Sequence, residues 1–208
     1  MRRQPAPATT GDRAFFRTPV LDSRPMRRLV LAIALLAVVA AGCGQSEGET
    51  HATTEGVYLE IGGLAYQIEM SRYMNANDIE DREYLKGLSS GTAQPGPDET
   101  WFGVWVRVEN FSGEARPAAD TWEIRDTLDK IYRPIPIDTD SNVFAFQKGI
   151  EVPPGVTLPL PSTAAGQGPI QGSLLLFKIK NDSLQNRPLE LRFSNGSQGE
   201  IGSYDLDV

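Results

Sequence analysis

The stretch Trp101-Phe-Gly-Val-Trp-Val-Arg-Val-Glu109 decides the fold of this chain, because its side chains alternate in character at every step. One of the two alternating sets is apolar throughout and consists of Phe102, Val104, Val106 and Val108. Successive side chains of a β-strand point to opposite faces of the sheet, so the pattern predicts a strand with one face in a core. We expect Val104 and Val106 to lie inside the domain together with Phe177 and Leu191.

Alternation of the same kind continues on both sides of this stretch. It is found in residues 57–61, 64–70, 122–124, 175–179, 189–193 and 204–208. In the second of these runs we expect Leu64, Tyr66, Ile68 and Met70 to share one face. Turn-forming residues such as Pro153-Pro-Gly155 separate the runs. Several short strands with turns between them predict an all-β domain built as an antiparallel β-sandwich.

One segment breaks the alternation. Residues 77–88 place Tyr84 and other apolar side chains among charged ones, with Asn77 as the expected N-cap and Glu80 three residues later. This pattern predicts a short helix of about two turns followed by a polar loop. Helix and loop together form an insertion over about residues 75–99.

The insertion leads directly into the strand that carries Trp101 and Trp105. The two indoles lie four residues apart on the face opposite the valines, which places them about 13 Å apart at ~3.3 Å per residue. On an exposed face they would form a platform for a sugar or a peptide. Tyr84 is a further candidate contact residue, because tyrosine and tryptophan are common in binding hot spots. In a second interpretation the insertion covers the indoles and completes the fold.

The order of these strand and turn residues resembles the DUF4352 domain family. The residues that carry the resemblance are 101–110, 121–126, 128–132, Pro154-Gly155, 172–177 and 189–193. The resemblance covers about residues 57–208 and implies an immunoglobulin-like β-sandwich related to a secreted mycobacterial antigen. It also implies an exported lipoprotein with no established reaction, and the insertion at 75–99 is longer than the usual pattern of the family.

The first 42 residues predict an export signal. Met26-Arg-Arg28 precedes the apolar run 29–41, and a cysteine follows at position 43. A basic start and an apolar run of this length are typical of a signal peptide, whereas a membrane-spanning helix needs about 20 apolar residues. These proportions predict that Met26 is the true initiator, that 26–42 are the signal peptide and that 1–25 are an over-extended N-terminus.

Ala40-Ala-Gly-Cys43 resembles the bacterial lipobox. The resemblance implies a diacylglyceryl group on the Cys43 thiol and cleavage after Gly42, which would anchor the protein at the extracytoplasmic face of the cell membrane. Residues 44–56 contain no large apolar side chain. We therefore expect residues 43–56 to form the lipidated end and a flexible linker, followed by one domain at 57–208.

Composition and charge exclude several classes of function. One cysteine and one histidine exclude a disulfide framework and a zinc site built on several such ligands. The chain has 20 basic and 27 acidic residues, and seven of the basic residues but only two of the acidic ones lie in the first 42 positions. The rest of the chain is therefore strongly acidic, so nucleic acid is not an expected partner. The one histidine, His51, falls in the expected linker, so no Ser-His-Asp or Cys-His arrangement is expected in the domain.

Two groups of polar residues are candidates for chemistry. Asp138, Asp140 and Asn142 have the one-three-five spacing of a calcium loop, but positions six and twelve lack the required Gly and Glu. The segment 78–83 carries four acidic residues, and paired carboxylates at a suitable separation serve glycoside hydrolysis. The alternatives are a polar connection between strands for the first group and a solvated helix face for the second.

We therefore expect a non-catalytic interaction module of the cell envelope, held to the membrane through the lipid on Cys43. Its expected partner is an envelope protein or polymer that contacts Tyr84, Trp101 or Trp105. No cofactor is indicated. The first alternative is a small-ligand or calcium-binding lipoprotein. The second alternative, ranked below it, is an envelope hydrolase that uses carboxylates.

Overall fold

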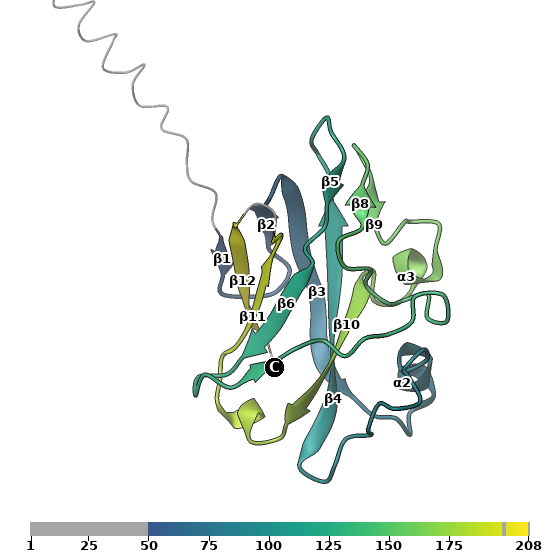
Figure 1. The fold of residues 1–208 in the computed structure, drawn as a ribbon, viewed down its shortest axis with the longest axis vertical. Coiled ribbons are helices and arrows are strands. Elements are labelled where there is room, and N and C mark those ends of the chain that lie inside the picture. The colour runs from purple at the N-terminus through teal and green to yellow at the C-terminus, as the bar shows by residue number, and fades with distance from the viewer. Residues whose placement is uncertain (1–49, 197–198, 208) are drawn as a thin grey trace, which may run out of the picture. The chain divides into compact units, whose positions relative to one another are not determined.

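The computed structural model describes residues 50–196 and 199–207 (Figure 1). Cys43, the expected signal peptide and the start of the expected linker lie outside these residues. In the described part no helix is long and apolar enough to cross a bilayer. Its helical segments are short and comprise α2 (Ile79–Tyr84), α3 (Ala164–Gln167) and the 3-10 helix η1 (Ser183–Gln185).

Two β-sheets pack as a sandwich, which confirms the predicted all-β fold (Figure 1). Sheet A has the strand order β1 (His51–Ala52), β12 (Ile201–Leu206), β11 (Leu189–Ser194), β6 (Thr121–Arg125) and β7 (Ile131–Tyr132). Sheet B has the order β10 (Ser173–Lys180), β4 (Glu99–Glu109), β3 (Leu64–Met74) and β2 (Tyr58–Ile61), with β9 (Thr157–Leu158) also paired to β4. A small separate pair is formed by β5 (Arg116–Pro117) and β8 (Glu151–Val152).

The apolar core lies between the two sheets. Val104, Val106, Phe177 and Leu191 are buried in it, as predicted. The first three come from β4 and β10, which pair in antiparallel fashion, and Leu191 comes from β11 in sheet A. Full burial of an aliphatic or phenyl side chain of this size stabilises a fold by about 1.5–3 kcal/mol. The alternation of the β4 stretch therefore reflects its contact with the core.

A β-bulge in β3 corrects the expected face of Met70. The register of β3 against β4 shifts between Ile68 and Met70. An extra residue in a strand reverses which of the following side chains face the core. Beyond the bulge Ser71 is opposite Val104 and buried, whereas Met70 is 38% exposed. The prediction that Met70 shares a face with Ile68 is therefore wrong.

Residues 50–56, which we expected to be linker, belong to the folded domain. Strand β1 pairs in parallel with β12, and the side chain of Ala52 is buried in the core. Further along, the carboxylate of Glu55 accepts hydrogen bonds from the hydroxyl and the backbone N–H of Ser71. Burial raises the pKa of Glu55, although these hydrogen bonds oppose the shift. The partners of this segment are remote in sequence, which is why composition alone suggested a linker.

Helix α2 is shorter than expected and its N-cap is Asp78 rather than Asn77. The Asp78 carboxylate accepts a hydrogen bond from the backbone N–H of Glu80 at 2.8 Å, which satisfies one of the free donors of the first turn. Gly87 follows the helix with a φ of +75°, and a Cβ there would lie 2.8 Å from the carbonyl oxygen of Asp138. The turn after α2 therefore requires glycine at this position.

Candidate functional site

The indoles of Trp101 and Trp105 are buried, which corrects the prediction of an exposed platform. Trp101 is 2% exposed, Trp105 is 0% exposed and Tyr84 is 7% exposed. They belong to a second apolar cluster on the outer side of sheet B, together with Met74, Ile170, Leu174 and Leu176. Tyr84, from α2, packs against Trp105. The insertion thus covers the indoles, so none of the three predicted contact residues is available to a partner.

An ion pair holds the insertion over sheet B. The Arg72 guanidinium donates a hydrogen bond to the Asp81 carboxylate at 2.6 Å and lies over the ring of Trp105, 5.2 Å from its centroid. The other carboxylate oxygen of Asp81 accepts the backbone N–H of Asn75 at 2.7 Å. Burial of Asp81 acts to raise its pKa, but the hydrogen bonds from Arg72 and Asn75 lower it below the usual value. Asp81 is therefore a structural carboxylate.

Two further acidic residues of the segment 78–83 also have structural partners. Asp78 caps α2, and Glu83 forms an exposed ion pair with Lys86 at 2.6 Å. Asp78 and Glu83 lie at opposite ends of the short helix. Both carboxylates thus take part in local contacts of the helix.

The calcium candidates form a turn instead of a ligand set. The carboxylate of Asp138 accepts hydrogen bonds from the backbone N–H of Asp140 and the hydroxyl of Ser141. Asn142 is buried, and its side-chain amide donates to the carbonyl oxygens of Tyr84 and Lys86 at 2.8 and 2.9 Å. Across the described residues, no group of three or more His, Cys, Asp or Glu side chains is placed to hold a metal ion.

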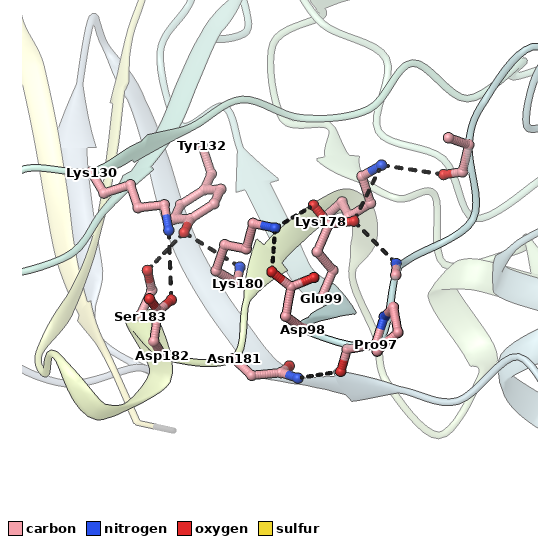
Figure 2. A network of polar contacts seen from close by, with 12 residues as sticks. Pro97, Asp98, Glu99, Lys130, Tyr132, Lys178, Lys180, Asn181, Asp182 and Ser183 are labelled. Carbon is pink, nitrogen blue, oxygen red and sulfur yellow. Dashed lines mark hydrogen bonds and ion pairs between the residues drawn. The ribbon is translucent and has the colours of Figure 1, made fainter.

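A polar network joins the end of β10 to the chain before β4 and to β7 (Figure 2). Lys180 Nζ lies 2.6 Å from Asp98 and 3.3 Å from Glu99, and the hydrogen bond that Lys180 donates to the Asp98 carboxylate raises the pKa of Lys180. Lys130 is 3.5 Å from Asp182. Each of these lysines already has a carboxylate partner, so the network serves to connect strands and presents no unpaired cation.

The structure brings His51 beside two residues of β12. Its Nδ1 lies 2.8 Å from the Ser203 hydroxyl and its Nε2 lies 3.8 Å from the Asp205 carboxylate. Sequence reasoning missed this arrangement because 152 residues separate His51 from Ser203. The backbone N–H of Ser203 donates to the carbonyl of Thr50 at 2.8 Å, so it is not free to stabilise an oxyanion. The three side chains hold β1 against β12.

A groove lies along the outer edge of β10, and we call it the β10 groove. It has a cavity volume of about 310 Å³ and is formed by parts of residues 134–139, 145–148 and 174–176. Its wall belongs to the long connection 133–150 between β7 and β8. Structureless connections longer than about 12–15 residues are uncommon in compact domains and usually have a function.

Backbone hydrogen bonds fix this connection to β10. The N–H of Ile135 donates to the carbonyl of Leu176 at 2.7 Å, and the N–H of Phe146 donates to the carbonyl of Leu174 at 2.8 Å. Leu174 in turn donates its N–H to the carbonyl of Phe144 at 2.6 Å. Because both ends of the connection are attached to the same strand, the β10 groove is preformed.

A second hollow shares part of its lining with the β10 groove. Its volume is about 240 Å³, and Ala145, Phe146 and Gln147 line it as they line the β10 groove. Val143 and Leu160, 64% and 45% exposed, border this hollow. Apolar side chains therefore extend across the surface from the β10 groove toward the chain after β9.

Sequence reasoning interpreted the region that forms the β10 groove as a polar connection. Two features of the sequence could have indicated that this connection is an ordered part of the domain. The Pro134-Ile-Pro-Ile137 stretch places two large apolar side chains between prolines, and the connection is unusually long. Neither signal shows by itself that the connection packs against β10.

No family model and no curated protein sequence matches this chain, so the resemblance to the DUF4352 family stays a prediction. The described fold is similar to the yjhA protein of Bacillus subtilis, with a TM-score of 0.47, 13% identity, and coverage of 74% of this chain and 99% of that one. It is also similar to ycdA of Bacillus subtilis, named as a candidate lipoprotein, with a TM-score of 0.45, 11% identity and coverage of 72% of this chain. The match spans 38% of ycdA.

A third similar structure is an uncharacterized β-sandwich protein from Clostridium difficile. Its TM-score is 0.43 and its identity is 9%, with coverage of 79% of this chain and 100% of that protein. Of these similar structures, one is named as a β-sandwich protein and another as a candidate lipoprotein.

Proposed function

We propose that this chain is a lipid-anchored binding module at the extracytoplasmic face of the cell membrane and that it carries no chemistry of its own. The lipobox-like Ala40-Ala-Gly-Cys43 supports the anchor. A diacylglyceryl group together with a further acyl chain is sufficient for stable attachment to a membrane, whereas one chain is marginal. The expected partner is another component of the envelope, a protein or a polymer.

The β10 groove is the observation that carries the binding role. It is preformed, mostly apolar, and bordered by a long connection whose ends are bonded to β10. Concave apolar sites with a few polar groups are the usual form of ligand sites. The surface that we expected to bind, the indole pair of Trp101 and Trp105, is used by the fold itself. The proposal therefore moves the contact surface from the indole pair to the β10 groove.

The anchor is tested by Cys43→Ala in cells fed a radiolabelled or alkynyl fatty acid. We expect the variant to lose all lipid label and to accumulate as an unprocessed precursor. The native chain should remain in the membrane fraction after a high-salt wash. Undiminished label on the Cys43→Ala variant would reject lipidation at this residue.

The binding surface is tested by placing a photo-crosslinking amino acid at Gln147, which lines the β10 groove and is exposed. The matched control carries the same amino acid at Glu114, whose side chain is 80% exposed outside the groove. In intact cells we expect a discrete adduct from position 147 and none from position 114. Equal adducts at both positions, or none at either, would reject the groove as the binding surface.

A further inference from the structure

The floor of the β10 groove is mostly apolar. Its lining includes the partly buried Ile135, Ile137 and Ala145, next to Phe146, Leu174 and Leu176, which are each 8% exposed or less. Its volume of about 310 Å³ is at the lower end of the range of small-molecule sites, so it suits a compact ligand. Pro134 and Pro136 restrict the wall, which reduces the conformational entropy that a bound ligand would have to offset.

The edge of β10 is already occupied at the groove. The carbonyl oxygens of Leu174 and Leu176 accept hydrogen bonds from Phe146 and Ile135, and the N–H of Leu174 also has a partner. A peptide that binds by adding a strand needs such groups free. Recognition in this groove must therefore come from the filling of the apolar cavity and from a charged group at its border.

Lys148 supplies that charged group. All five lysines of the chain lie in the described part, and the other four form ion pairs with Asp or Glu: Lys86, Lys130, Lys178 and Lys180. Lys148 lines the groove, and within the described residues it has no ion pair. Partial burial lowers its pKa, while the nearby carboxylate of Asp120 acts in the opposite direction.

Asp120 is close enough to influence the charge of Lys148, but among the described residues it forms no ion pair with it. Its Oδ1 already accepts hydrogen bonds from the hydroxyl of Thr121 at 3.0 Å and from the N–H of Gly196 at 3.3 Å. Asp120 does not line the groove, whereas Lys148 does. An ammonium beside an apolar cavity attracts an anion whose remaining surface is apolar.

Building on the proposed binding function, we propose that the β10 groove binds a small monocarboxylate with an apolar body. The apolar part of the ligand would contact the partly buried Ile135, Ile137 and Ala145, and its carboxylate would pair with Lys148. Positive and uncharged molecules of the same shape would bind less tightly, because only the carboxylate gains the interaction with the ammonium.

The test compares three water-soluble probes of one chain length: hexanoate, 1-hexanol and hexylamine. Each is titrated by calorimetry and by NMR into the chain from residue 43 onward with Cys43→Ser, which keeps every described residue. We expect hexanoate to bind most tightly and hexylamine least tightly. Amide shifts should concentrate at Phe146 and Leu174.

Two variants and one control separate the contribution of the Lys148 charge to binding from that of the apolar cavity. Lys148→Gln should weaken hexanoate by about 3- to 10-fold and leave 1-hexanol unchanged, because a partly exposed ion pair makes a modest contribution. Ala145→Leu, which adds volume to the lining, should weaken all three probes. Lys86→Gln is the matched control, because Lys86 is paired with Glu83 and lies outside the groove.

Equal affinity for the three probes, or unchanged hexanoate affinity in Lys148→Gln, would overturn the proposed ligand class. Absence of hexanoate binding together with a groove-specific adduct from position 147 would overturn the ligand class and leave the binding module standing. Absence of both would overturn both proposals, and thermal melting of each variant must match the parent chain for any loss to count.

Discussion

The ring of Tyr84 stands edge-on to the indole of Trp105, with ring centroids 5.2 Å apart and planes inclined at 82°. This contact joins the helical insertion to the middle of β4. Edge-to-face pairs of this kind contribute about 0.5–1.5 kcal/mol beyond the burial of their surface. Trp105 is therefore a core residue of the domain although it lies on the face of β4 opposite the valines.

Trp105→Ala should lower the free energy of unfolding by about 3–5 kcal/mol, because it removes a fully buried aromatic side chain. For a domain of this size the melting temperature should fall by roughly 10 °C or more. Chemical and thermal unfolding of purified protein measure both quantities. Phe111→Ala is the control, because Phe111 is 78% exposed and its loss should change stability little. Similar stability of the two variants would contradict the burial of Trp105.

Gly103→Ala should destabilise the domain although it adds only a methyl group. A Cβ at this position would lie 2.7 Å from Cη2 of Trp105 and 2.8 Å from Sδ of Met74. Overpacking of a filled core typically costs about 1–3 kcal/mol. Gly113→Ala is the matched control, since no atom lies within 4 Å of a Cβ at that position. Urea unfolding should separate the two variants clearly, and equal midpoints would sink this account of Gly103.

Asp81→Asn should destabilise the domain by roughly 2–3 kcal/mol at neutral pH. Removal of one partner of a fully buried ion pair costs about 3–5 kcal/mol. We expect less here because the Arg72 side chain is 32% exposed, although that of Asp81 is only 7% exposed. Glu83→Gln removes a carboxylate from the exposed pair with Lys86 and should have almost no effect.

The pH dependence of the Asp81 effect has a definite sign. The folded state lowers the pKa of Asp81 below the usual value of 3.8, so the carboxylate stabilises the fold at pH values above that value. The contribution is lost as the pH falls through the lowered pKa. The stability difference between the parent chain and Asp81→Asn should therefore be constant from pH 8 to pH 5 and shrink in acid. A difference that grows as the pH falls would show that the sign is wrong.

Removal of residues 50–56 should destabilise the domain by roughly 2–4 kcal/mol, the sum expected from a buried alanine and several hydrogen bonds. The deletion removes Ala52, which is 4% exposed, and the hydrogen bond from the Gly56 N–H to the Ile68 carbonyl at 2.8 Å. The comparison is between chains that start at Thr50 and at Val57, unfolded in urea. Equal stability of the two chains would favour the interpretation of residues 50–56 as a linker, which their composition suggests.

Much of the fold follows from the alternation in β4 and in the strands around it. Val104, Val106 and Phe177 take the positions that a period of two predicts, because an inward face must be apolar along its whole length. The phase of Met70 could not be predicted in this way. A bulge inserts one residue without changing the local pattern of residue types, so the sequence from 64 to 70 has the same appearance with or without it.

The candidate site was less predictable than the fold. The alternation of residue types indicates that the two faces of β4 differ, but it does not indicate that one of them faces solvent. The aromatic face of Trp101 and Trp105 is buried by Tyr84 and by residues of the 133–150 connection such as Phe144. These segments lie far apart in sequence, and nothing local records their contact.

By itself, the sequence determined that this chain forms β-strands with one apolar face, places a short helix between two of them, and carries a lipobox-like cysteine after an apolar run. These features depend on neighbours within a few residues. Only the tertiary structure decided that His51 pairs with β12, that the indoles serve the core, and that a groove bordered by Lys148 lies along β10. Each of these depends on contacts between segments remote in the chain, and their free energy appears only when the sheets and the connection 133–150 pack together.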